Sequence, residues 1–389
     1  MFPENNIQRR HMKSTMRTRA LGMALTALML GTPVIARADQ SEDVDALRQQ
    51  LLQLQQRLDE LEVSQKETRA TADKAAKASE KNVRSKFDLS VGGLLQVHGY
   101  APLSGDGSQG NNTFRLRRGE LKLTAKITDR ITGVAMFDIA KAKNAPKEKD
   151  AVLQEINIAY LLSKSATNKT YLDVGQFKLP LGYESLTSSS ALPLLDRSMI
   201  FTQGKYGDVR DTGAQLRGNA GKLEYRLGVF NGLGKYQNTT ADEDGKAIAG
   251  RLLWKASDGV QLGASAAKGS DSGNIFNLFA GYTAKKFWLA GEYGRGSSGS
   301  GSSIVEGDGF NLTAGYRFNP KFEAVARYDT FDDASKGNAK EATLGLNYYI
   351  KSNNAKIQLN LVKHDGPFGS GSGYQYDWTE LRSGFQVAF

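Results

Sequence analysis

The chain has 389 residues, no cysteine, 42 glycines and a formal net charge of +10, and its mean hydropathy is negative. The lack of cysteine excludes a disulfide framework, so a large core or a closed sheet has to stabilise the fold. A pI near 9.4 would permit nucleic-acid binding. The sequence has neither a basic helix nor an aromatic nucleic-acid motif, so we expect no nucleic acid among its partners.

Residues 1–38 have the pattern of a cleaved secretory signal peptide. Lys13, Arg17 and Arg19 precede an apolar run from Ala20 to Ala36, and Ala36-Arg37-Ala38 forms an A-x-A cleavage site. An uncleaved membrane anchor is the alternative, but the run is short for a spanning helix. Cleavage after Ala38 would leave 45 basic and 40 acidic side chains, so much of the positive charge belongs to the leader.

Residues 39–86 have the pattern of a helix with a heptad seam. The apolar residues are spaced 3, 4, 3, 4 and 3 positions apart, at Val44, Leu47, Leu51, Leu54, Leu58 and Leu61. This a/d spacing predicts a coiled-coil stalk that associates with copies of itself, most plausibly as a trimer. A solvated helix folded back on one subunit is the alternative.

After Phe87 the apolar period changes from about 3.5 to 2 and stays near 2 to the last residue, Phe389. The fold class that we predict is all-β, a 16-stranded antiparallel transmembrane β-barrel over residues 87–389 with an N-terminal α-helical coiled-coil segment. The predicted strands are 90–100, 114–126, 130–140, 152–162, 170–178, 210–218, 222–230, 247–256, 259–268, 274–284, 286–295, 308–318, 321–329, 341–351, 355–363 and 379–389.

The connections between the predicted strands alternate between short turns and longer loops. Long connections are expected at 101–113, 141–151, 179–209, 231–246, 269–273, 296–307, 330–340 and 364–378. This alternation is typical of an outer-membrane barrel with its turns in the periplasm and its loops outside. The last strand, 379–389, has to pair with the first strand near Val91 to close the barrel. We therefore expect the protein in the outer membrane of a Gram-negative bacterium, with lipid around it and the stalk in the periplasm.

The alternation also assigns the two faces of each strand. In the second strand, Leu121 and Leu123 should face lipid, while Arg118 and Lys122 should face the lumen. Sixteen strands enclose a channel too wide for side chains to fill, so the pattern predicts a water-filled pore. The predicted lumen has more cations than acids and favours anions. Among these cations are Lys178, Arg217 and Arg226, although many of the lumen charges are expected to form cross-strand pairs.

The loop 179–209 stands apart by its length and by its apolar stretches 191–195 and 199–201. Such stretches are unfavourable in open water and predict a loop folded into the barrel, where it narrows the channel. Arg197, Lys205 and Arg210 would then meet Arg118 and Lys122 across the gap and bind anions. A loop that covers a trimer axis and touches no solute is the alternative.

Five segments resemble successive blocks of the phosphate-selective porin O and P family: 114–123, 136–139, 173–182, 194–197 and 228–232. The most specific of them contains Gly175-Gln-Phe-Lys-Leu-Pro180. The resemblance implies a trimeric sixteen-stranded porin with an arginine-rich constriction for phosphate or polyphosphate. It also implies that Arg117 and Arg118 are constriction arginines and that Asp138 is a nearby acid.

Passive diffusion of small anions, phosphate foremost, is therefore the function that we expect from the sequence. A general or weakly anion-selective porin, and a barrel anchor whose stalk contacts peptidoglycan, are the alternatives. A sugar channel would need lumen aromatics, of which Trp288 and Tyr349 are the candidates. The chain has only three histidines and no catalytic or metal-ligand spacing, so we expect no enzyme activity, no cofactor and no bound metal.

Overall fold

The structure is a computed structural model that describes residues 41–84, 88–104, 112–144, 152–234, 245–269, 273–298, 305–367 and 377–389. The predicted signal peptide, residues 1–38, lies outside the described residues. The chain divides into two units, Met1–Glu80 and Lys81–Phe389, and each unit is described by itself.

The first unit contains one long helix, α1 (Ser41–Arg84), which confirms the helical segment predicted from the heptad pattern. Its seam leucines are exposed in the single chain, with Leu54, Leu58 and Leu61 at 58%, 63% and 66% of full exposure. Among the described residues, no helix is both long and apolar enough to cross a bilayer. The association of α1 with other copies stays a prediction.

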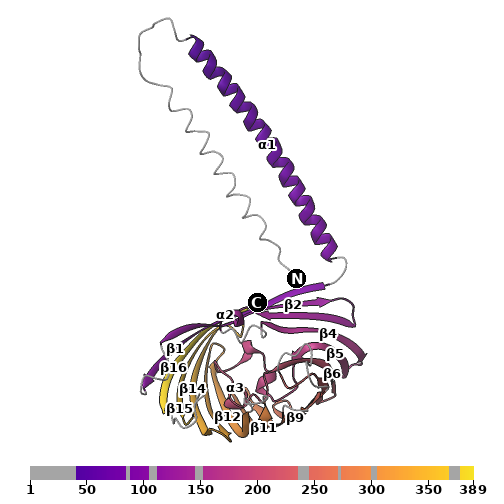
Figure 1. Ribbon diagram of the computed structural model, residues 1–389, viewed down its shortest axis with the longest axis vertical. Coiled ribbons are helices and arrows are strands. Elements are labelled where there is room, and N and C mark those ends of the chain that lie inside the picture. Colours follow the sequence, from indigo (N-terminus) through magenta and orange to yellow (C-terminus); the bar gives the residue numbers. More distant parts are fainter. Residues whose placement is uncertain are drawn as a thin grey trace. The chain divides into compact units, whose positions relative to one another are not determined.

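The second unit is a closed antiparallel barrel, and the described residues supply its sixteen strands (Figure 1). The strands are β1 (Asp88–Ser104), β2 (Thr113–Lys126), β3 (Ile131–Asp138), β4 (Leu153–Lys164), β5 (Lys169–Lys178), β6 (Arg210–Ala220), β7 (Leu223–Phe230), β8 (Ala247–Lys255), β9 (Val260–Lys268), β10 (Asn274–Thr283), β11 (Phe287–Ser298), β12 (Val305–Asn319), β13 (Phe322–Asp333), β14 (Gly337–Lys351), β15 (Ala355–Asp365) and β16 (Trp378–Ala388). The predicted fold class of the barrel is confirmed, and each predicted strand overlaps the corresponding observed one.

The barrel closes where β1 pairs with β16. Gly93 and Phe389 exchange two backbone hydrogen bonds of 2.9 and 3.1 Å, so the terminal residue pairs two positions from the predicted Val91. One predicted connection is wrong. The long loop expected at 330–340 is a tight turn at 334–336, because β13 and β14 both extend beyond their predicted ends and pair as far as Asp333 and Gly337.

Side chains alternate between the two faces of the wall as predicted. On β14, Leu344 and Leu346 point outward and are 64% and 46% exposed, whereas Asn347 points inward and is fully buried. Large apolar side chains therefore cover the outside of the barrel, and polar side chains line much of the inside.

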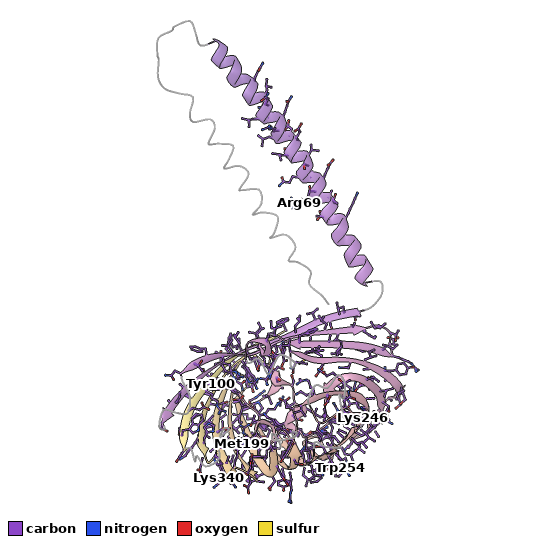
Figure 2. All side chains as sticks on the ribbon, viewed as in Figure 1. Arg69, Tyr100, Met199, Lys246, Trp254 and Lys340 are labelled. Carbon is purple, nitrogen blue, oxygen red and sulfur yellow. The ribbon has the colours of Figure 1, made fainter. Side chains whose placement is uncertain are left out.

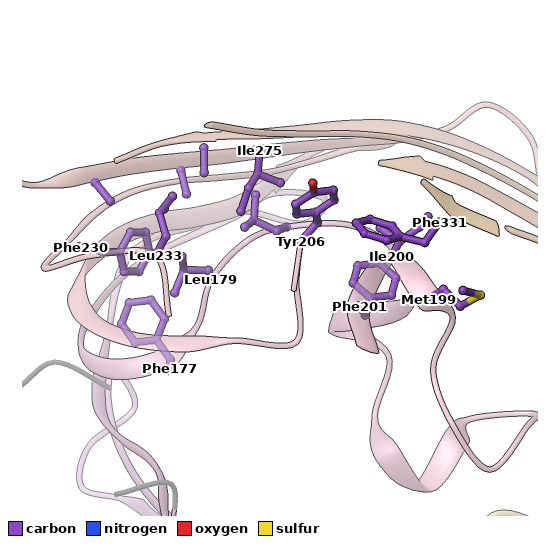
Figure 3. Close-up of a cluster of buried hydrophobic side chains, with 14 of the residues drawn as sticks. Phe177, Leu179, Met199, Ile200, Phe201, Tyr206, Phe230, Leu233, Ile275 and Phe331 are labelled. Carbon is purple, nitrogen blue, oxygen red and sulfur yellow. The ribbon is translucent and has the colours of Figure 1, made fainter. Parts of the chain in front are cut away.

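The segment between β5 and β6, residues 179–209, folds into the barrel and is called the inward loop below. It contains two short 3₁₀ turns, η2 (Glu184–Leu186) and η3 (Ser189–Ala191), and the one-turn helix α3 (Met199–Thr202). Met199, Ile200 and Phe201 are almost completely buried. They pack with Tyr206 and with wall residues such as Phe331 in one apolar cluster (Figure 3). The predicted position of this loop is confirmed.

The apolar cluster explains an exception to the polar lumen. Three wall residues that point inward on β8 and β9 are alanines, Ala247, Ala249 and Ala267, and each of them is buried in this cluster. Small apolar side chains here let the inward loop lie close against the wall. One side of the lumen wall is therefore a packed core between the loop and the strands.

Candidate functional site

Backbone carbonyls of the inward loop are held by polar side chains of the wall. Lys356 on β15 donates to the carbonyl of Leu192 at 2.6 Å, and Asn347 on β14 donates to that of Pro193 at 2.9 Å. On β8, Arg251 donates to the carbonyl of Gly182 at 2.9 Å. These bonds satisfy polar groups that an ordered loop would otherwise bury without partners, so the wall fixes the loop in one place.

A buried cluster of charges fixes the same loop to β13 and β14. The Arg327 guanidinium lies 2.6 Å from Asp329 and 3.0 Å from Glu341, and its side chain is only 2% exposed. It also lies 3.7 Å from Glu184 on the loop and donates to the carbonyl of Asp196 at 2.9 Å. Arg327 is thus a structural cation that joins the wall to two points of the loop.

Arg117 and Arg118 both lie on the lumen side of β2, although strict alternation would place one of them outside. The pairing with β1 shifts between Gln96↔Arg118 and Val97↔Leu116, so Arg117 is the extra residue of a β-bulge. Arg117 reaches Asp196 on the inward loop at 3.7 Å. Arg118 is 7% exposed and donates to Gln96 at 2.6 Å. Both predicted constriction arginines therefore face the inward loop.

Arg197 points away from the lumen and braces the inward loop from within. It is 5% exposed, pairs with Asp208 at 3.0 Å and donates to the carbonyl of Thr187 at 3.0 Å. Lys178 pairs with the same carboxylate at 2.5 Å. Burial alone would raise the pKa of Asp208, but Lys178, Arg197 and Arg210 outweigh it and hold that pKa far below its ordinary value. The donors of Arg197 are thus used inside the loop, and its contact with a solute stays a prediction.

Two further predicted cations share one carboxylate on β4. Lys122 lies 3.6 Å and Arg210 lies 3.8 Å from Glu155. Lys122 is the more open of the two, with 45% of its side chain exposed, whereas Arg210 is buried. Lys205 is exposed and has a φ of 59°, and it belongs to the part of the inward loop that follows α3.

Three arginines form a row on β6, β7 and β8. Arg217 pairs directly with Arg226, and Arg226 pairs directly with Arg251, so three guanidinium groups lie at one level of the wall. We call Arg217, Arg226 and Arg251 the arginine row. Arg217 binds Asp173 at 2.5 Å and lies over the ring of Tyr171. Within the part of the chain that the structure describes, Arg226 has no carboxylate within 4 Å.

Directly opposed like charges destabilise a sheet, so the row needs either water or anions beside it. Arg217 and Arg226 are partly exposed to the lumen. Arg251 is buried under the inward loop and over the ring of Phe279. The sequence pattern predicted Arg217 and Arg226 as separate cations of the lumen. Their alignment with Arg251 depends on the exact strand register, which the sequence pattern does not give.

Three acids inside the barrel accept hydrogen bonds from backbone amides. Asp138 accepts the N–H groups of Gly119 and Ala140 at 2.9 and 3.2 Å and is 2% exposed. Glu292 accepts those of Tyr183 and Glu184 at 2.8 and 3.2 Å. Asp211 accepts the N–H of Gly234 at 3.1 Å. The predicted acid Asp138 is therefore near the β2 arginines but is turned into the wall.

The described part of the chain contains no group of three or more histidine, aspartate or glutamate side chains placed to hold a metal ion. The sequence reasoning missed three acids that position the loop, Asp196, Asp208 and Glu341, and it missed Asp173, which holds Arg217 on the wall. Their partners are 11 positions (Arg197 and Asp208) to 186 positions (Asp196 and Arg382) away along the chain, so the register and the path of the loop bring them together.

Residues 106–387 match the family model described as putative beta-barrel porin-2, OmpL-like. The chain is similar to the anion-selective porin from Comamonas acidovorans, with 13% identity and a TM-score of 0.56 over 78% of this chain and 100% of that chain. OprB of Pseudomonas putida has 12% identity and a TM-score of 0.58, and the match covers 82% of this chain and 97% of that chain. The outer membrane channel DcaP of Acinetobacter baumannii has 11% identity and a TM-score of 0.54, and the match covers 78% of this chain and 98% of that chain. No curated protein matches.

Proposed function

Because the chain belongs to the OmpL-like β-barrel porin family and is thus a passive channel of the Gram-negative outer membrane, we propose that its lumen prefers small anions. The expectation of a porin is confirmed by this family, whereas the narrower resemblance to phosphate-selective porins stays a prediction. The observation that carries the proposal is the arginine row, above all the unpaired Arg226.

The charges that a passing solute would feel are not the same as the charges in the sequence. Asp138 and Glu292 are buried and accept hydrogen bonds from backbone amides. Arg327 is buried among acids. Arg226 is open to the lumen, and no carboxylate of the described residues lies within 4 Å of it. Lys122 and Arg217 are also partly exposed, and each has one carboxylate partner. A cationic wall in a narrow aqueous passage raises the local concentration of anions.

Phosphate suits the arginine row better than chloride does. A guanidinium presents paired N–H donors that match two oxygens of one phosphate. Neighbouring strands are about 4.8 Å apart, so the two partly exposed members of the row, Arg217 and Arg226, offer such donors at successive points across the wall. A phosphate or short polyphosphate can therefore replace part of its hydration shell at several positions as it passes.

Planar-bilayer recordings of the full chain test this proposal. The reversal potential in a KCl gradient should show anion preference, and Arg226→Gln should lower the anion-to-cation permeability ratio about two- to fivefold, the effect of losing roughly 0.4–1 kcal/mol. Arg130→Gln, in the exposed turn between β2 and β3, is the matched control and should leave the ratio unchanged. Added phosphate should compete with the chloride current. A cation-selective current from the unaltered protein would overturn the proposal.

We further propose a homotrimer whose α1 helices form a periplasmic coiled coil. The support is the exposed leucine seam, because Leu54 and Leu58 have no apolar partner within the described part of one chain. A stalk of this kind would lie in the periplasm, where it could contact peptidoglycan. The stalk would then anchor the outer membrane to peptidoglycan in addition to the conduction of ions by the barrel. If bilayer recordings show no current, anchoring becomes the main proposed function.

A further inference from the structure

A cavity of about 600 Å³ lies inside the barrel, between the inward loop and the wall strands β9 to β14. It extends to the end of the barrel that carries the short turns, where Thr283, Lys286 and Asn353 are among its lining residues. Its size is within the range of roughly 300–1,000 Å³ that small-molecule sites occupy. The arginine row lies on other strands, so this cavity is separate from the site proposed above.

One carboxylate, that of Glu323 on β13, holds three side chains from three other strands around this cavity. It accepts the indole N–H of Trp288 at 2.9 Å and the hydroxyl of Tyr349 at 2.5 Å. The Arg317 guanidinium lies 3.5 Å from it and 4.6 Å from the centre of the Tyr349 ring. Glu323 is 4% exposed, so its role is to position these groups rather than to meet a solute.

Trp288 lies over a glycine of the neighbouring strand. Gly315 is its direct partner on β12, and a side chain at position 315 would overlap the indole ring. The backbone of Gly315 thus supports one side of the ring, while Trp288 also lines the cavity. A water-filled channel does not require a fixed aromatic surface. The Trp288 ring therefore suits a solute that has an apolar face of its own.

The cavity also presents a positive group in a fixed place. The Arg317 side chain is 43% exposed and has one carboxylate neighbour, so most of its five N–H donors are available. Lys285 and Lys286 line the same cavity near its mouth, and within the described part of the chain neither has an ion-pair partner. The three acids that line the cavity already have partners. Glu323 accepts from three side chains, Glu292 accepts two backbone amides, and Glu184 accepts the N–H of Ser198.

We infer that this cavity is a binding site for an acidic monosaccharide of hexuronate size. The sugar ring stacks on Trp288, the carboxylate pairs with Arg317, and the hydroxyls meet neutral polar groups such as Gln261 and Thr313. A bare phosphate has no face to place on the indole, and a neutral hexose offers no carboxylate to the exposed donors of Arg317. The inference rests on the proposed anion preference and adds a solute class and a second site to it.

The test uses the reconstituted full chain and measures block of the chloride current by D-glucuronate, D-glucose and inorganic phosphate. Trp288→Leu should raise the half-blocking concentration of glucuronate about two- to tenfold, the range expected for the loss of one aromatic contact. Trp288→Phe keeps an aromatic face and should stay near the unaltered protein. Trp254→Leu is the matched control, because Trp254 is on the outside of β8 and 51% exposed (Figure 2).

Arg317→Gln separates the acidic part of the inference from the stacking part. It should raise the half-blocking concentration of glucuronate about tenfold, towards that of glucose, because a charge-assisted hydrogen bond is lost. Equal block by glucose and glucuronate in the unaltered protein would overturn the acidic assignment. A Trp288→Leu channel that behaves like Trp254→Leu would overturn the site, while the reversal potential would still report the arginine row independently.

Discussion

Replacement of Arg327 by leucine is the sharpest structural test of how the inward loop is held. The guanidinium lies within 3.0 Å of Asp329 and Glu341 and donates to the carbonyl of Asp196 on the loop. Its side chain is 2% exposed, so water cannot replace it. Removal of one partner from a buried ion pair costs about 3–5 kcal/mol, because the other charges stay buried without compensation.

The expected result for Arg327→Leu has two parts. Denaturant unfolding of the barrel in detergent, followed by tryptophan fluorescence, should show a free energy of unfolding lower by about 3–5 kcal/mol. Single-channel recordings should show a larger or noisier conductance, because the loop loses its contacts with β13. Arg130→Leu is the matched control, since Arg130 is in an exposed turn and should change stability by less than about 0.5 kcal/mol.

A double variant examines the reason for the loss. If uncompensated charge is the cause, Arg327→Leu combined with Asp329→Leu should recover part of the lost free energy, because an apolar group replaces the stranded carboxylate. Equal unfolding midpoints for Arg327→Leu and Arg130→Leu would refute the reasoning. The reasoning would also fail if the double variant lost more free energy of unfolding than the two single variants lose together.

Two other changes probe the loop and the stalk. The pKa of Asp208 is depressed in the folded protein, so this carboxylate stabilises the fold fully above its ordinary pKa near 3.8 and loses the effect only as the pH falls below that value. Asp208→Asn should therefore lower the thermal midpoint at pH 7, and the difference from the unaltered protein should shrink only under strongly acidic conditions. A difference that vanished already at pH 5 would contradict this sign. In the stalk, Leu54→Ser with Leu58→Ser should reduce the helical circular dichroism signal and leave the barrel's heat-dependent gel mobility unchanged; unchanged helicity would argue against a coiled coil.

The barrel was predictable because its strands repeat a pattern that the bilayer imposes. Outward apolar residues such as Leu344 alternate with inward polar residues such as Asn347 along much of the wall, so even weak signals identify sixteen strands. The ends of the strands were less predictable. β13 and β14 continue past their apolar stretches, because backbone pairing can extend into water where side-chain pattern gives no signal.

The position of the inward loop was predictable from its apolar content, but the role of its charges was not. Arg197 was expected to meet a solute, yet Asp208 and the carbonyl of Thr187 take up its donors. The sequence shows which side chains carry charge, whereas their partners depend on how the loop turns at η2 and α3. The β-bulge at Arg117 is a similar case, because strict alternation would have placed this side chain outside the lumen.

The same distinction decides how a lumen of mixed charge can favour one sign of ion. A charge influences a passing solute only if it is neither paired nor turned into the wall. Asp138 and Glu292 accept hydrogen bonds from backbone amides, and Asp208 lies between two cations. These carboxylates therefore hold the fold together and contribute little to the field in the lumen. Arg226 has no such partner in the described structure, and the register of β6 to β8 places it between two other arginines. The preference for anions therefore follows from which charges the fold leaves uncompensated, rather than from the small excess of basic residues in the sequence.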